Sequence, residues 1–215
     1  MNKRACIITG GSLDKKFLTR YREKHPEDVC IVVDGALEIT HRLGMKPDFI
    51  VGDFDTVNQD LLSYYDEEII LRHPPEKDQT DTELAIETAL HAGCRELVFF
   101  GATGSRLDHS LGNIFLLESL LKQGIVAEIQ NENNRLYLKN ESFTLHRNKT
   151  CGDYFSLLPL SETVEEVTLT GFKYPVEKLT FYRERTLGIS NEITEEEARV
   201  EFLKGTFIVV ESRDK

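Results

Sequence analysis

The first part of this chain alternates short apolar runs with stretches of helical length, and this alternation limits the folds open to it. The runs are apolar at consecutive positions, so both faces of each strand are expected to be covered. Strands of this kind, separated by helices, are typical of a parallel sheet enclosed by helices. The expected strands are residues 5–9, 29–33, 49–51, 68–71, 97–100 and 125–129, and the expected helices include 13–24, 81–92 and 108–123.

The pattern changes at a polar break near residues 131–134. Beyond it, apolar residues alternate with polar ones, as at Leu136 and Leu138 or Val200 and Phe202, which predicts half-buried antiparallel strands. The segment 203–206 predicts a tight hairpin turn between two such strands. We therefore expect an α/β domain with a mostly parallel, Rossmann-like sheet over residues 1–130 and a smaller antiparallel β domain over residues 131–215.

Composition narrows the range of functions. The chain has 215 residues, of which 40% are hydrophobic and 29% charged, as in ordinary soluble globular proteins. A net charge of −11 argues against a nucleic-acid partner, and no apolar run approaches a membrane span. The apolar start is too short for a signal peptide, and the four cysteines have no paired spacing. Free thiols in a reducing cytoplasm are the expectation.

Aspartates follow the ends of several predicted strands. The carboxyl ends of parallel strands meet at one edge of a sheet, so these carboxylates are expected to gather there. They repel one another unless a cation lies between them, and oxygen ligands of this kind suit Mg²⁺, which usually also binds phosphate oxygens. The feature points to phosphate chemistry. The residues are Asp34, Asp53, Asp55, Asp78, Asp81 and Asp108.

Two segments carry most of this hypothesis. If the chain is still extended at Asp53-x-Asp55, both carboxylates point the same way and face one ion. Residues 80–83 have the form of a capping box, with Thr80 as the N-cap and Asp81 in the first helical turn. Alternatively, Asp81 only stabilises the helix terminus.

Cations and glycines accompany the carboxylates. Lys77 and Arg106 supply the positive charge that phosphoryl transfer needs, although either one alone is better explained as an ordinary surface cation. His109 either orients a nucleotide or is a buried histidine at a helix start. Glycines at several predicted strand ends would let a phosphate approach backbone amides. Because four such ends fall on one predicted edge, a ligand site is favoured over ordinary turns.

Five short motifs occur in a specific order and spacing between about residue 30 and residue 191. Together they resemble the thiamine pyrophosphokinase family. The resemblance implies an α/β domain that binds ATP and Mg²⁺, and a C-terminal β-sandwich that binds thiamine. It also implies a homodimer, with thiamine bound where the β domain of one subunit meets the α/β domain of the other. The motifs are Asp34-Gly-Ala, residues 47–56, Lys77-Asp-Gln-Thr-Asp81, Arg106-Leu-Asp-His109 and Thr186-x-Gly-x-Ser-Asn191.

The resemblance also implies residue roles. Asp53, Asp55 and Asp81 would be metal ligands and, with Lys77, would form the catalytic set. Ser190 and Asn191 would contact thiamine. The family usually has one more residue inside the Asp34 motif, so the role of Asp34 beside the nucleotide is left open. The nucleotide or its phosphates would be contacted by Lys77, Asp78, Thr80, Arg106, Asp108 and His109.

The resulting hypothesis is Mg²⁺-dependent transfer of the pyrophosphoryl group from ATP to the hydroxyl of thiamine, with attack on the β-phosphorus and release of AMP. Asp55, Asp81 or Asp108 could take the proton, and the sequence does not choose among them. Two alternatives are a two-metal phosphohydrolase acting on a nucleotide and a regulatory module that binds Mg·ATP without turning it over. A purely structural protein would have no use for clustered carboxylates.

Overall fold

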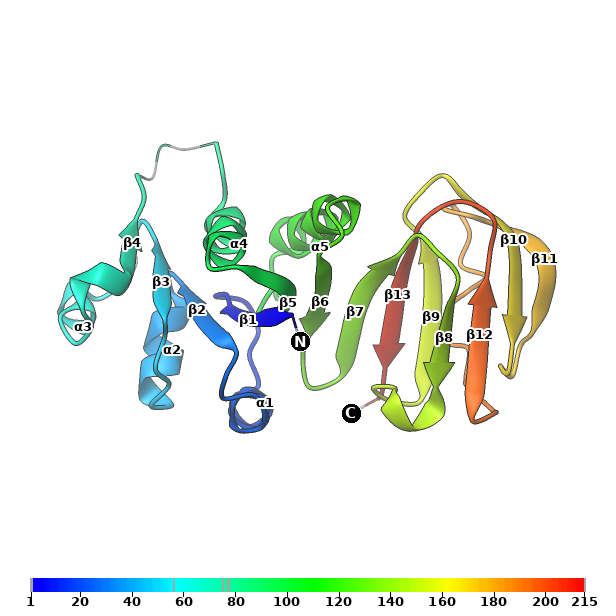
Figure 1. Cartoon of the computed structure of the whole chain (residues 1–215), viewed down its shortest axis with the longest axis horizontal. Coiled ribbons are helices and arrows are strands. Elements are labelled where there is room, and N and C mark those ends of the chain that lie inside the picture. Colours follow the sequence, from blue (N-terminus) through cyan, green and yellow to red (C-terminus); the bar gives the residue numbers. More distant parts are fainter. Residues whose placement is uncertain (1, 56, 75, 77, 215) are drawn as a thin grey trace. The chain divides into compact units, whose positions relative to one another are not determined.

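The chain divides into two compact units, Met1–Glu132 and Asn133–Lys215, called unit 1 and unit 2 below. The structure is a computed structural model that describes residues 2–55, 57–74, 76 and 78–214. Unit 1 carries the alternating helices and strands, and unit 2 consists mostly of strands (Figure 1). The change of pattern near residue 131 in the sequence therefore coincides with a change of architecture.

Unit 1 is built on a parallel sheet in the order β4-β3-β2-β1-β5-β6. Every neighbouring pair in this order is parallel, which confirms the prediction from the apolar runs. Parallel pairing needs a crossover between successive strands, and helices supply most of these crossovers. The strands are β1 (Lys3–Ile8), β2 (Val29–Val33), β3 (Phe49–Gly52), β4 (Ile70–Arg72), β5 (Cys94–Phe100) and β6 (Val126–Gln130).

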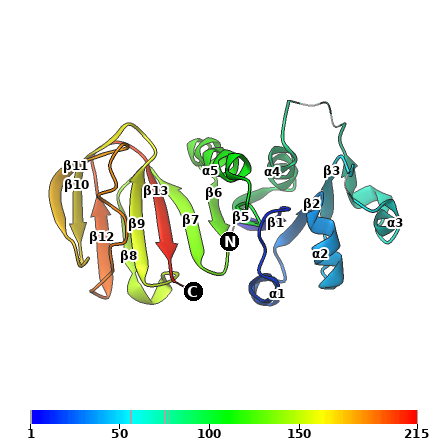
Figure 2. The ribbon, with the colours of Figure 1, turned by 180° about the vertical axis from the view of Figure 1, so that it is seen from behind.

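Helices cover both faces of this sheet. The two views show α4 and α5 on one face and α1 and α2 on the other (Figures 1 and 2). All five residues of β2 are buried, as expected for a strand covered on both sides. The helices are α1 (Lys15–Lys24), α2 (Ala36–Arg42), α3 (Gln59–Leu62), the 3₁₀ turn η1 (Glu67–Ile69), α4 (Asp81–His91) and α5 (Leu107–Lys122).

A network of polar side chains lies near the starts of β1 and β2 in unit 1. The buried carboxylate of Asp28 accepts hydrogen bonds from Arg4 Nε and from the Tyr21 hydroxyl, each at 2.8 Å. Arg4 Nη2 also lies 2.6 Å from Nδ1 of His25. Burial, and then the charge of Arg4, lower the pKa of His25 below its ordinary value of 6.5. The neutral form of His25 is therefore the one that fits this network.

This network makes the stability of unit 1 depend on pH. The folded-state pKa of His25 is depressed, so its contribution is present above pH 6.5 and is lost as the pH falls below that value. We expect the wild type to lose more thermal stability between about pH 7.5 and about pH 5.5 than a His25→Gln variant, which cannot titrate. Thermal melts test this, with His91→Gln at an exposed histidine of unit 1 as the control. Equal losses in wild type and His25→Gln would contradict it.

Unit 2 contains two antiparallel groups of strands that share one hydrophobic core. One has the order β7-β13-β9, and the other has the order β11-β10-β12-β8. Phe155 and Phe207 from the first group and Val167 and Val200 from the second belong to the same buried cluster. The elements are β7 (Asn134–Lys139), β8 (Phe143–His146), the 3₁₀ turn η2 (Arg147–Lys149), β9 (Tyr154–Pro159), β10 (Thr163–Thr170), β11 (Val176–Tyr182), β12 (Glu197–Glu201) and β13 (Phe207–Ser212).

The predicted hairpin at residues 203–206 is wrong. Strands β12 and β13, on either side of this segment, belong to different groups and pair with different neighbours. The connecting segment instead bonds to Glu165 of β10, which donates its N–H to Lys204 O and accepts one from Leu203 N, both at 2.9 Å. Alternating apolar residues mark a strand with one buried face, but they do not say which sheet it joins.

None of the helices in the described part of the chain is both long enough and apolar enough to cross a membrane.

Candidate functional site

A cavity of about 590 Å³ lies at the carboxyl ends of the strands of unit 1. Its walls are the segments that follow β1, β2, β3 and β5, together with the first turns of α4 and α5. The expectation that these segments meet at one edge is therefore confirmed. The arrangement follows from parallel topology, because every strand ends at this edge and every connection leaves from it.

Three carboxylates meet beside this cavity, and Asp34 and Asp53 are the two of them that line it. Asp34, Asp53 and Asp55 each offer an oxygen, and the three oxygens lie within 4.8 Å of one another. Asp34 and Asp53 are partly buried and Asp55 is exposed. Like charges at this distance repel, and a hard divalent cation such as Mg²⁺, which prefers oxygen ligands, would relieve the repulsion. The donor set therefore fits a divalent metal.

The expected third ligand, Asp81, lies elsewhere on the same cavity. It is the first residue of α4 and lines the wall, but it does not belong to the group of carboxylates found within the described residues. Asp34 occupies the place that was expected for it. The roles of Asp53, Asp55 and Asp81 as metal ligands stay predictions, and the geometry adds Asp34 to them.

The two carboxylates of Asp53-x-Asp55 do not converge in the way that was predicted. Strand β3 ends at Gly52, so the segment is no longer extended. Phe54 has φ +59, in the left-handed region, and its ring is buried in the core of unit 1. The backbone N–H of Asp55 then donates to Asp53 Oδ1 at 3.2 Å. A turn anchored by the Phe54 ring, and not the alternation of a strand, brings the carboxylates together.

Asp34 lies close to Asp53 and Asp55 because the residue packed against it, Gly52, has no side chain. The backbone of Asp34 also lies in the left-handed region, with φ +40, and its N–H donates to Val51 O at 2.9 Å. A Cβ at Gly52 would lie 3.1 Å from the Cβ of Asp34. A side chain at this position would require Asp34 to shift, so glycine favours this close approach of β3.

The glycines of the loops after β1 and β5 pack against each other. Gly11 N donates to Gly101 O at 2.8 Å, and a Cβ at Gly11 would lie 2.1 Å from that oxygen. Gly101 has φ +68, and its Cβ would lie 2.2 Å from Thr9 O. Of the glycines in these two loops, Gly10 has open space around its Cβ position and lines the cavity, as does Gly35 after β2. Close packing thus explains Gly11 and Gly101, while Gly10 remains suited to a ligand that approaches the backbone.

The start of α4 confirms the predicted capping box. Thr80 Oγ1 accepts a hydrogen bond from Glu83 N at 3.3 Å, and Glu83 Oε2 accepts one from Thr80 N at 2.8 Å. Both residues thereby satisfy orphan amides of the first turn. Thr80 and Asp81 line the cavity, so the cap also fixes the position of this wall.

The start of α5 presents a paired cation. Arg106 is its N-cap and lines the cavity, and its Nη2 lies 2.6 Å from Asp108 Oδ2. The hydrogen bond from Arg106 lowers the pKa of the Asp108 carboxyl to about 2. A carboxylate this acidic is a poor proton acceptor, which disfavours Asp108 as the base. His109 also lines the cavity.

Two other predicted residues receive less support. Lys77 lies outside the described residues. Asp78 is exposed and does not belong to the lining of the cavity, although Gln79 beside it does. Their roles stay predictions.

Sequence reasoning missed two polar residues on α5. Ser110 and Asn113 line the cavity and bond to the loop after β5. The signal that could have found them is their spacing, because they continue the helix that begins with Arg106 and His109 and lie one turn further along it.

Ser190 and Asn191 form a turn in unit 2. Ser190 is exposed and has φ +57. Asn191 is buried, and its side chain bonds to both backbone groups of Tyr174, donating to the carbonyl and accepting from the N–H, each at 3.0 Å. The amide of Asn191 therefore holds two segments of unit 2 together. Its predicted contact with thiamine stays a prediction.

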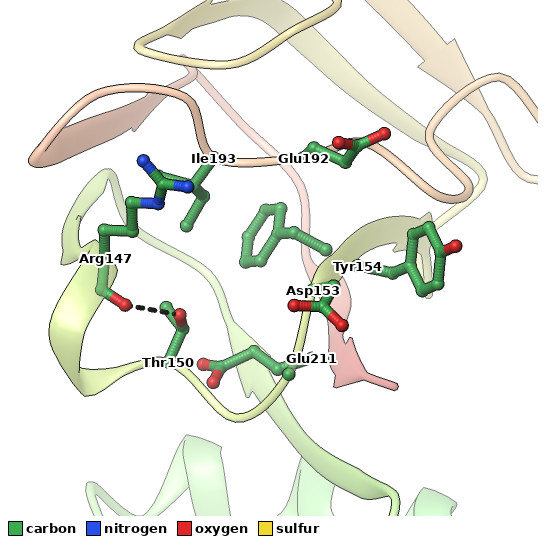
Figure 3. A pocket seen from close by; sticks show the side chains of 9 residues that line it. Arg147, Thr150, Asp153, Tyr154, Glu192, Ile193 and Glu211 are labelled. Carbon is green, nitrogen blue, oxygen red and sulfur yellow. Dashed lines mark hydrogen bonds between the residues drawn. The ribbon is translucent and has the colours of Figure 1, made fainter. Parts of the chain in front are cut away.

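Unit 2 contains a smaller hollow of about 220 Å³. Its lining includes Glu192 and Ile193, which follow Asn191 in the sequence. The carboxyl groups of Asp153, Glu192 and Glu211 border it together with Arg147 (Figure 3). Glu211 is 1% exposed and accepts hydrogen bonds from the Tyr137 hydroxyl at 2.9 Å and from Cys151 N at 2.6 Å. Two of these acids are offset by neighbouring cations, because Lys173 pairs with Glu192 at 2.5 Å and Arg135 lies 3.8 Å from Glu211, so the hollow carries no strong excess of negative charge.

Comparison with known families assigns both units. The family description "Thiamin pyrophosphokinase, catalytic domain" matches residues 22–129, and "Thiamin pyrophosphokinase, vitamin B1 binding domain" matches residues 142–207. The two matches fall on either side of the boundary between unit 1 and unit 2.

Relatives and solved structures agree with this assignment. The thiamine pyrophosphokinase of Bacillus subtilis is 33% identical over 97% of this chain and 98% of its own length. A crystal structure from the same organism has a TM-score of 0.86 at 31% identity, covering 99% of this chain and all of that one. The thiamin pyrophosphokinase structure from Geobacillus thermodenitrificans gives a TM-score of 0.85 at 32% identity, covering 99% and 98%.

Proposed function

The chain belongs to the thiamine pyrophosphokinase family, and we propose that the cavity of unit 1 is where it transfers the pyrophosphoryl group of ATP to thiamine. As a diphosphotransferase it produces thiamine diphosphate and AMP. One observation carries the assignment of the cavity. Asp34, Asp53 and Asp55 converge at a sheet edge that Arg106 and two helix starts also line.

The reaction needs a metal, and Mg²⁺ is the ion that we propose. Asp34, Asp53 and Asp55 would hold it, with Asp81 on the adjoining wall. When bound, such an ion offsets the charge on the phosphate oxygens during transfer.

The chain's own residues position the reactants. Arg106 presents a guanidinium toward the cavity and is held in place by Asp108, so it can pair with phosphate oxygens. The hydrogen bond from Arg106 lowers the pKa of Asp108, so Asp55 or Asp81 is favoured over Asp108 for taking the hydroxyl proton of thiamine. Because transfer depends mostly on positioning and on charge, a weak base is sufficient.

Unit 2 is proposed to bind thiamine. Its two groups of strands, which share one core, are consistent with a β-sandwich. Ser190 and Asn191, which form a turn in this unit, are the proposed contacts. A homodimer with thiamine at the subunit interface rests on the family resemblance. The free state of all four cysteines supports a cytoplasmic location.

We expect the protein to release AMP from ATP only when thiamine is present, and to stop when a chelator removes divalent ions. Restoring Mg²⁺ should restore activity, because the clustered carboxylates depend on a cation for function. AMP, ADP and thiamine diphosphate are separated and quantified by chromatography.

The alternatives give different products in this assay. A nucleotide phosphohydrolase would form AMP or ADP from ATP without thiamine. A nucleotide-binding regulatory module would retain Mg·ATP and form no AMP after thiamine is added. Either pattern would contradict the proposed transfer to thiamine. Activity that persists in excess chelator would contradict the proposed need for a divalent metal.

A further inference from the structure

We propose that Asn113, together with Ser110, is a positioning residue that fixes the cavity wall at residues 101–104 for the nucleotide. The proposal rests on the proposed function, since that function assigns the cavity to ATP. It concerns residues outside the acidic group and outside the Arg106–His109 motif. Neither side chain needs to touch the reacting atoms.

Two neighbouring elements hold the wall at residues 101–104, and successive residues bond alternately to one and to the other. The loop after β1 holds Gly101 and Thr103, whose carbonyls accept hydrogen bonds from Gly11 N and Ser12 N, both at 2.8 Å. Helix α5 holds the other two positions. Asn113 Nδ2 donates to Ala102 O at 2.7 Å, and Gly104 N donates to Ser110 Oγ at 3.2 Å. Each residue from 101 to 104 thus has one backbone group fixed by a neighbouring element.

Helix α5 and its N-cap also carry residues that line the cavity. Ser110 and Asn113 are three residues apart, so they lie on one face of α5. Arg106 and His109 line the cavity just before them, and Ser110 Oγ donates to Arg106 O at 2.9 Å. Helix α5 therefore contacts both the cation at its start, through Ser110, and the wall, through Ser110 and Asn113.

The hydrogen bond from Asn113 matters because its acceptor, the carbonyl of Ala102, is buried. Ala102 is 2% exposed, so its carbonyl has little access to water if the Asn113 amide is removed. A carbonyl left in that position favours a shift of the wall toward another donor. A displacement of this kind affects a nucleotide bound against the wall and leaves the thiamine contacts of unit 2 unchanged.

The test uses Asn113→Ala and the near-isosteric Asn113→Asp, which replaces the donor with a carboxylate. We expect the Kd of α,β-methylene-ATP with Mg²⁺, and the KM for ATP, to rise about 10-fold while the KM for thiamine is unchanged. Asn113→Gln keeps the amide donor and should recover most of the affinity. Calorimetric titration without thiamine measures binding independently of turnover.

Ser142→Ala is the matched control, because Ser142 clamps the backbone of Phe202 in unit 2 by the same kind of contact. It should leave the Kd of the analogue unchanged even if it lowers Tm. An analogue Kd within about twofold of wild type in Asn113→Ala, or equal losses for ATP and thiamine, would overturn the proposal. A wild type that binds the analogue but forms no AMP would instead contradict the proposed function.

Discussion

Replacing Asp53 with Asn should lower kcat by about 10²–10³-fold without lowering the stability of the metal-free protein. Asp53 shares a group with Asp34 and Asp55 in which all three oxygens lie within 4.8 Å. Removing one charge weakens the hold on a cation, but it also removes repulsion between carboxylates. The amide oxygen of Asn can still accept the hydrogen bond from Asp55 N, so the turn is kept.

Steady-state turnover across a Mg²⁺ titration, together with melts in excess chelator, separates these effects. We expect a lower kcat, a higher Mg²⁺ midpoint and an equal or higher Tm. Asp66→Asn is the matched control, because Asp66 is an exposed aspartate that makes no side-chain cap hydrogen bond. Near-normal turnover of folded Asp53→Asn would rule out the carboxylate group as the metal site.

The coarse fold could be predicted because its signals are local. Runs that are apolar on both faces predict parallel strands, and the Thr80–Glu83 pair predicts a helix start, since both depend on neighbouring residues. The gathering of polar segments at one edge then follows from parallel topology without any knowledge of side-chain positions.

The details of the site could not be predicted because they depend on packing between distant segments. The turn at Phe54 exists because its ring enters the core, and Asp34 joins the carboxylates because Gly52 leaves room for it. Asn113 looks like an ordinary polar residue on a helix until the loop after β5 lies against it. The sheet that β12 joins depends in the same way on contacts with β10 and β8.

Replacing Gly11 with Ala should destabilise unit 1 and impair use of ATP. The new Cβ would lie 2.1 Å from Gly101 O and 2.5 Å from Thr103 O, and both are backbone atoms. The loops after β1 and β5 must separate to admit it, at a cost of about 1–3 kcal/mol. That loss should lower Tm by roughly 2–12 °C, since each kcal/mol corresponds to about 2–4 °C in a chain of this size.

The cavity wall contains both oxygens, so its movement should also lower kcat/KM for ATP by about 10²-fold. Two glycines provide controls. Gly10→Ala meets no atom within 4 Å and should keep the wild-type Tm, although it lines the cavity. Gly112→Ala lies in α5 with equally open space and should raise Tm slightly, because alanine is the better helix former. If Gly11→Ala melts like Gly10→Ala and uses ATP normally, the two loops are not packed as closely as these distances require.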